Sequence, residues 1–339
     1  MFRKIARKII RKIILFGVAV VLPVLMASAA GLAANPITIK FSHAAAENTP
    51  KGKMAIKFKE LVAERLGGRV QVEVFPDSQL FDDNNEIEAM LLGEVQLIAP
   101  ALAKFERYTQ QLRIFDLPFL FRDMAAVEKF QRSAKGQALL NSMESQGVAG
   151  LGYLHDGLKQ LSCTSPIKVP VDASGLKFRI MASDVLAAQF QAVHAVPLKK
   201  PFSEVFTLLR TKEIDGQEST YSTIYSNNFF EFQSHITESN HGVLDYMLVT
   251  SIQFWMSLPE DIRKDVKKAL DEAIFYGNEI AAARDLANKQ MIVASQHTKI
   301  ITLSGAERNQ WIEVMNPVWL RFEDEIGREL IDAAYQANM

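Results

Sequence analysis

The stretch Gly175-Leu-Lys-Phe-Arg-Ile-Met181 alternates apolar and polar side chains, as a β-strand with one buried face does. Leu176, Phe178 and Ile180 share the apolar face, and Arg179 lies on the opposite face. A guanidinium group donates two parallel hydrogen bonds to a carboxylate, so Arg179 is a candidate ligand for an organic acid. Taken alone, however, the segment favours the plainer interpretation of a solvated arginine on a strand. The surrounding chain must decide between the two.

The first part of the chain alternates strands and helices. Strands are predicted over residues 36–42, 69–75 and 95–99, and amphipathic helices over about 50–66 and 82–92. A β-α-β-α-β order is typical of a mostly parallel sheet with crossover helices. We therefore expect a first α/β lobe.

The strand at Gly175–Met181 opens a second unit of the same kind. Before it, residues 148–153 and 158–163 are predicted as two extended pieces with a break at His155-Asp-Gly157. After it, a helical pattern runs from Pro259 to Ile292 and would span about 50 Å at 1.5 Å per residue. That length exceeds one small lobe. The sequence thus predicts two similar α/β lobes with a long helix lying across both.

The N-terminus has the pattern of a secretory signal peptide. A basic region without acidic residues precedes an apolar run, 13–26, and then small residues up to Ala34. Cleavage after Ala29, Ala33 or Ala34 fits the small-residue rule. A retained membrane anchor is the alternative, but the apolar run is short for a span. We expect residues 1–34 to be removed and the mature chain to be exported.

Charge and cysteine content narrow the classes of function. Without the six basic residues of the predicted signal peptide, 32 Lys and Arg face 39 Asp and Glu, a net charge of −7. A mildly acidic chain is a poor partner for nucleic acid. Cys163 is the only cysteine and is interpreted as a small buried side chain rather than a nucleophile.

Two further candidates for ligand binding lie in the first lobe. Ligands of parallel sheets bind where strand ends meet helix N-termini. His43 follows the first strand, and Lys51 lies in the first turn of the first helix, where backbone N–H groups favour anions. The alternatives are an exposed lysine and a histidine whose hydrogen bonds are satisfied at a strand end.

The sequence contains no recognisable catalytic or metal motif. The six histidines do not have zinc-ligand spacing, and neither a Gly-x-Ser-x-Gly elbow nor a phosphate-binding glycine loop is present. Asp215 and Glu218 are interpreted as a turn residue and a structural acid rather than a catalytic pair. No cofactor is predicted.

Ordered sequence blocks resemble those of substrate-binding proteins of tripartite ATP-independent periplasmic (TRAP) transporters. The resemblance covers nearly all of the chain after residue 34. The blocks are Phe41-Ser-His43, Glu47-Asn-Thr-Pro-Lys-Gly52, Phe75-Pro-Asp-Ser-Gln-Leu80, Phe115-Asp-Leu-Pro118, Gly175-Leu-Lys-Phe-Arg179, Phe202-Ser-Glu-Val205 and Asp215-Gly-Gln-Glu218. Each is weak alone, and their order is specific. The first block and Pro100-Ala-Leu-Ala-Lys-Phe105 resemble members that bind four-carbon dicarboxylates.

The resemblance implies roles for particular residues. Arg179 matches the arginine that pairs with the ligand carboxylate, and Lys159 stands where relatives carry a second cation. Phe202 matches a residue that packs on the ligand. Ser219 replaces the usual asparagine, and serine is shorter with one donor instead of two, so a water bridge is expected there. With Lys51 and His43, these form the predicted ligand set.

The resemblance also implies a fold and a function. It implies a two-lobe periplasmic-binding-protein-like fold with hinge strands. Lobe I is expected to comprise residues 35–156 and about 245–284, and lobe II residues 157–244 and about 285–339. The protein would capture an organic acid by lobe closure, with a C4-dicarboxylate as the leading ligand and a monocarboxylate or larger acid as the alternative. Its partners would be the integral membrane subunits of the transporter.

Two other classes of function stay open on the residues alone. A periplasmic enzyme would use His155 or His241 with Asp156 or Glu218, and would turn over an organic acid. A binding protein for a sensor, or a chaperone-like module, would show no small-molecule stabilisation.

Overall fold

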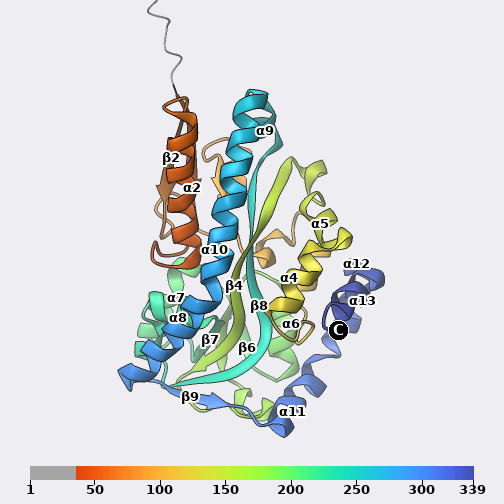
Figure 1. The fold of residues 1–339 in the computed structure, drawn as a ribbon. Helices are drawn as coiled ribbons and strands as arrows, with labels where there is room; N and C mark the ends of the chain where they lie inside the picture. Colours follow the sequence, from red (N-terminus) through yellow and green to blue (C-terminus); the bar gives the residue numbers. More distant parts are fainter. Residues whose placement is uncertain (1–35) are drawn as a thin grey trace, which may run out of the picture. The chain divides into compact units, whose positions relative to one another are not determined.

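Residues 36–339 are described by the computed structural model, and the predicted signal peptide, 1–34, lies outside them. From Thr38 to the C-terminus these residues form one unit, in which a single nine-stranded sheet is covered by helices (Figure 1). The strands are β1 (Ile37–Ser42), β2 (Val70–Phe75), β3 (Leu97–Ile98), β4 (Val148–Cys163), β5 (Lys177–Ile180), β6 (Val196–Lys199), β7 (Gly216–Ser219), β8 (His235–Ser251) and β9 (Lys299–Thr302).

Two groups of short strands flank two long strands in this sheet. The order is β2-β1-β3-β8-β4-β7-β5-β6, and β9 pairs with β8. Pairing is parallel between β1 and β3 and between β5 and both β6 and β7. The long strands β4 and β8 run antiparallel to each other and to their outer neighbours β7 and β3. The predicted α/β class and two-lobe arrangement are confirmed, with β4 and β8 as the shared centre.

The predicted break at His155-Asp-Gly157 is wrong, because β4 continues from Val148 to Cys163. Its register against β8 shifts between His155 and Gly157, and Gly157 has a φ of 150°. A β-bulge bends a strand and increases its twist without ending its pairing. The residues that suggested an interruption therefore form a bulge inside one long strand.

Helices cover this sheet and connect its strands. They are α2 (Pro50–Leu66), α3 (Glu86–Leu91), α4 (Met124–Arg132), α5 (Ala134–Leu140), α6 (Asp184–Ala192), α7 (Val205–Arg210), α8 (Tyr221–Ser226), α9 (Ile252–Ser257), α10 (Glu260–Ser295), α11 (Gly305–Met315), α12 (Val318–Ile326) and α13 (Arg328–Gln336). Within residues 36–339, none of them is long and apolar enough to cross a membrane.

The long helix predicted from Pro259 onward is confirmed as α10, with 36 residues. It contacts α2 beside the first strand group, β4 at the centre and α8 beside the second group (Figure 1). Gly277 lies at its closest approach, since a Cβ there would stand 2.7 Å from Leu154 Cδ1 and 3.0 Å from Met54 Cβ. The glycine that interrupts the helical pattern therefore permits tight packing of α10 on α2 and β4.

Candidate functional site

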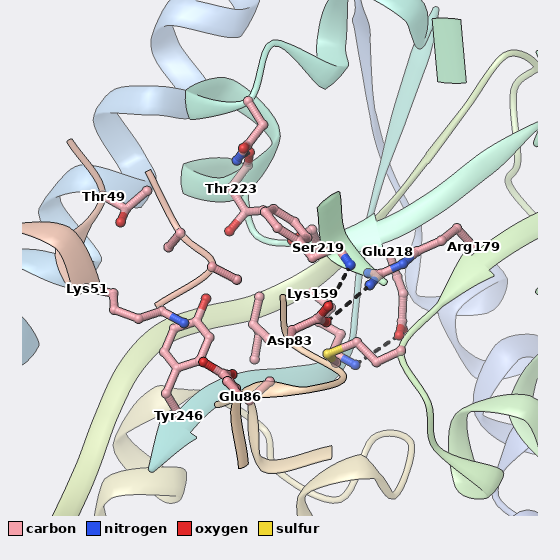
Figure 2. Close-up of a pocket in the computed structure, with 17 residues that line it drawn as sticks. Thr49, Lys51, Asp83, Glu86, Lys159, Arg179, Glu218, Ser219, Thr223 and Tyr246 are labelled. Carbon is pink, nitrogen blue, oxygen red and sulfur yellow. Dashed lines mark hydrogen bonds and ion pairs between the residues drawn. The ribbon is translucent and has the colours of Figure 1, made fainter. Parts of the chain in front are cut away.

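A pocket lies among side chains contributed by both strand groups (Figure 2). Its polar lining comes from positions far apart in the sequence, which are Thr49, Lys51, Asp83, Glu86, Lys159, Arg179, Glu218, Ser219, Thr223, Asn227 and Tyr246. A ligand here would contact segments from both halves of the sheet.

The structure brings five of the six predicted ligand residues to this pocket. They are Arg179, Lys159, Ser219, Lys51 and Phe202. Each comes from a different element: β5, β4, β7, the first turn of α2 and a 3-10 turn, Phe202–Glu204. Their position lets them reach a ligand, while their individual roles stay predictions. The sixth, His43, is not among the lining residues.

Arg179 is buried in β5, with 5% of its surface exposed, and is not a solvated surface arginine. Its Nε donates to the carbonyl of Lys200 at 2.9 Å, which fixes the guanidinium plane. Its Nη2 is buried and has no hydrogen-bond partner among the described residues. The closest carboxylate, that of Asp83, lies 3.8 Å away, beyond hydrogen-bond distance. Arg179 therefore offers donor capacity to a ligand.

Lys159 is charge-compensated by an acid on the neighbouring strand. Its Nζ donates to Glu218 at 3.0 Å, and the other carboxylate oxygen of Glu218 lies 2.8 Å from His241 Nε2. Burial alone would raise the pKa of Glu218, but the charge of Lys159 and the hydrogen bond from His241 hold it at about 2. All three side chains are almost completely buried. This network holds Lys159 in one position at the pocket wall.

Lys51 lies in the first turn of α2, which Thr49 caps by accepting a hydrogen bond from Gly52 N–H at 3.2 Å. Its Nζ donates to the carbonyl of Ala99 at 2.9 Å and lies 3.4 Å from the centre of the Tyr246 ring. Burial lowers the pKa of Lys51 to about 8, although nearby acids act in the opposite direction. Lys51 forms no ion pair with any residue in the described part of the chain.

Asp83 connects the two halves of the sheet at this pocket, and sequence reasoning missed it. One carboxylate oxygen accepts from Phe202 N–H at 2.8 Å, and the other lies 2.7 Å from Lys104 Nζ. Burial would raise the pKa of Asp83, but Lys104 and Arg179 lower it below its usual value. The available sign in the sequence was the acid pair Asp82-Asp83, which follows the family block 75–80 and precedes α3.

His43 lies in the core and not at the pocket surface. It is fully buried, and its ring packs edge-on against Phe41 at a centroid distance of 5.7 Å. Within the part of the chain that the structure describes, neither ring nitrogen has a hydrogen-bond partner. Burial, with the nearby charge of Lys51, lowers the pKa of His43 to about 3, so the ring is neutral. The position of His43 at the end of β1 indicated a region near the pocket, but its side chain packs in the core.

Ser219 ends β7 and pairs with Gln160 of β4 across the sheet. The next residue, Thr220, caps α8 and donates to Asp156 Oδ2 at 2.8 Å. Thr223 donates to the same oxygen at 2.9 Å. The backbone at Ser219 is thus held in place by β4 on one side and by the cap of α8 on the other.

A two-lobe α/β protein whose enclosed pocket presents fixed cations to its interior is a solute-binding protein. The chain belongs to the bacterial extracellular solute-binding proteins, family 7, whose profile matches residues 41–325. It is a TRAP-type transport protein and not an enzyme.

Named relatives and solved structures agree with this membership. The chain is 64% identical to the "C4-dicarboxylate-binding periplasmic protein DctP" of Shewanella loihica, over 90% of this chain and 91% of the relative. It is 47% identical to the protein of that name in Vibrio cholerae, over 92% and 94% of the two chains. A TRAP periplasmic solute-binding protein of Shewanella oneidensis, solved with bound succinate, has 63% identity and a TM-score of 0.89, covering 90% of this chain and all of the other.

Proposed function

We propose that this protein captures a C4-dicarboxylate in the periplasm and delivers it to the integral membrane subunits of a TRAP transporter. The observation that carries the proposal is the separation of two cations in one enclosed pocket. Arg179 and Lys51 lie on opposite sides of the view in Figure 2, and neither has a carboxylate within hydrogen-bond distance. A ligand with a carboxylate at each end matches this arrangement. The succinate bound to the Shewanella oneidensis protein supports the same ligand class.

We assign the ligand contacts as follows. Arg179 forms a bidentate pair with one carboxylate, because its guanidinium plane is fixed and its Nη2 is free. Lys51 binds the second carboxylate. Lys159, whose charge is balanced by Glu218, offers a further N–H donor beside the first, Phe202 packs over the guanidinium, and Ser219 reaches the ligand through water. His43 supports the wall through packing and makes no direct contact.

Capture is proposed to proceed by lobe closure about the two long strands. The proposed lobe boundary at residues 156 and 157 coincides with the bulge of β4 at Gly157, where the strand bends. A ligand that contacts both lobes stabilises the closed form by its differential affinity. The proposal takes residues 1–34 to be removed on export, so the mature chain has no membrane anchor, and its negative charge disfavours nucleic acid.

A thermal-shift screen across mono- and dicarboxylic acids tests the proposal. At a ligand concentration about 100 times Kd, stabilisation amounts to about 2.7 kcal/mol, which gives a clear rise in the melting temperature. Succinate, fumarate and malate are expected to stabilise the mature protein, and calorimetry then gives their affinities. If only monocarboxylates or larger acids stabilised the protein, the assignment of a C4-dicarboxylate as the ligand would be wrong. Turnover of an organic acid by the purified protein would contradict the function.

Replacing Lys51 with methionine is expected to weaken succinate binding about tenfold or more, and to change butyrate binding less than about threefold. The reason is that only a diacid places a second carboxylate beside Lys51, whereas the methionine keeps a similar length and apolar stem. Calorimetry with both acids measures the difference. Lys53→Met, two residues along the same helix and half-buried, is the matched control. Equal losses for both acids would remove Lys51 from the second-carboxylate role.

A further inference from the structure

Glu86 is an acid in the pocket wall whose carboxyl group has no assigned partner. It is the first residue of α3 and is 1% exposed. It lines the pocket, and its Oε2 is buried without a hydrogen bond to any of residues 36–339. In Figure 2 it lies beside Lys51 and Tyr246, on the side of the view away from Arg179. A buried carboxylate without hydrogen bonds is costly, so this group needs either a proton or a partner.

The charged groups around Glu86 do not contact its carboxyl group directly. Lys51 from α2 donates to the carbonyl of Ala99, and Lys104 from the 3-10 turn Leu102–Phe105 pairs with Asp83 at 2.7 Å. The acids Asp83 and Asp82, from the segment before α3, add negative potential. Glu86 itself forms no ion pair within 4.0 Å among residues 36–339. Its surroundings therefore do not supply a counterion in direct contact.

The charge balance of the pocket also disfavours an ionised Glu86. In two ion pairs at the pocket, Lys159 with Glu218 and Lys104 with Asp83, the positive and negative charges cancel. Arg179 and Lys51 then remain for the two carboxylates of a dianionic ligand. A third negative charge on the wall would repel that ligand in a poorly screened interior. Burial raises the pKa of Glu86 to about 8, with the charge of Lys51 opposing the rise.

We propose that Glu86 is a neutral carboxylic acid that donates a hydrogen bond to the bound dicarboxylate, so that the loaded protein holds one proton in its pocket. This inference rests on the proposed function and specifies how the end of the ligand nearer Lys51 is recognised. A protonated carboxyl supplies an O–H donor directed at the pocket, whereas the ionised form accepts only. The anionic ligand accepts this bond and stabilises the protonated state further.

The protonation of Glu86 makes the affinity for the dicarboxylate depend on pH. Below about pH 8, Glu86 keeps its proton in both free and loaded protein, so Glu86 itself is expected to add no pH dependence to the affinity. Above this pH, loading requires uptake of a proton, and affinity falls. Loss of the Lys51 charge, whose pKa is also about 8, acts in the same direction. A pH profile of affinity alone therefore does not separate the two groups, and a direct observation of Glu86 is needed.

Carbon-13 NMR of protein labelled at the glutamate side-chain carboxyl provides this observation. The resonance that disappears in Glu86→Gln is assigned to Glu86. With succinate bound at pH 7, it is expected at the chemical shift of a neutral carboxyl, and to move only above about pH 8. By calorimetry, Glu86→Gln is expected to weaken succinate binding about three- to fivefold, since an amide is a weaker donor. Glu86→Ala, which removes the donor to a charged acceptor, is expected to weaken it about 10- to 100-fold.

Glu88→Gln is the matched control, because it makes the same change at an exposed position of the same helix. It is expected to alter neither the Glu86 resonance nor the affinity. An ionised Glu86 at pH 7 in a protein that binds succinate would overturn this inference and leave the proposed function standing. The inference would also be overturned if Glu86→Ala bound succinate with unchanged affinity. The same holds if Glu86→Gln folded but bound no succinate. A wild-type protein that binds no dicarboxylate would overturn both.

Discussion

Replacing Arg179 with alanine is expected to weaken succinate binding about 100-fold or more while leaving the protein folded. Truncating one member of a buried, hydrogen-bonded charge pair costs about 2–5 kcal/mol, part of which is the unpaired charge left behind. Here the ligand carboxylate would be left facing a wall without its fixed donor. Calorimetry measures the loss, and circular dichroism with a melting curve checks the fold.

The fold is expected to survive this substitution because few native contacts depend on Arg179. Its guanidinium makes one hydrogen bond, to the carbonyl of Lys200, and Asp83 keeps Lys104 and Phe202 N–H as partners when Arg179 is removed. Burying a cation also carries a desolvation cost that alanine does not. A melting temperature close to that of the wild type would therefore accompany the loss of binding.

Two further variants in β5 show whether the loss of binding is specific to the guanidinium of Arg179. Arg179→Lys keeps the charge and loses the planar fork, so an intermediate loss is expected if bidentate geometry contributes. Lys177→Ala, at the exposed start of β5, is the matched control and is expected to bind like the wild type. An Arg179→Ala protein that binds organic acids as tightly as its parent would remove Arg179 from the site.

Replacing Glu218 with glutamine is expected to lower the free energy of unfolding by about 3–5 kcal/mol at pH 7, since it leaves Lys159 buried without its counterion. Lys159 and Glu218 are each almost completely inaccessible, at 1% and 2% side-chain exposure. Chemical denaturation measures the change. The double variant Lys159→Met with Glu218→Gln is expected to recover much of the loss, because it removes both charges of the pair.

The same network predicts a pH dependence with a definite sign. The folded-state pKa of Glu218, about 2, lies below its unfolded value of about 4.3. Its stabilising contribution is therefore complete above the unfolded value and is lost as the pH falls from there through about 2. The difference in stability between wild type and Glu218→Gln should shrink over that range. A difference that stays constant down to pH 3 would show that the charge of Glu218 is not its source.

Local sequence features were sufficient for several elements of this fold. The long helix beginning after Pro259 is present as predicted, and the cap at Thr49 and the capping box of Ser304 with Glu307 likewise involve residues close together in the sequence. These features depend on hydrogen bonds and periodicities that span one or two turns of chain. They can be predicted because the interacting groups are neighbours in sequence.

The candidate site was accessible to prediction only in part. The ordered family blocks directed attention to Arg179 and Lys51, both of which line the pocket. The same family blocks also led to the prediction of His43 as a ligand residue, but its side chain is buried in the core. It also missed Glu86, because an acid at the start of a helix is an ordinary surface residue unless the packing around it is known.

The sequence by itself determined the α/β alternation, the long crossing helix and the alternating parity that separates Arg179 from the apolar face of its strand. Only the tertiary structure decided that Arg179 on this second face is also buried, and that Lys159 meets Glu218 and His241. The physical reason is that burial and charge pairing depend on the register between strands far apart in the chain, here β4 against β7 and β8. Periodicity along one strand carries no information about what its neighbours place opposite it.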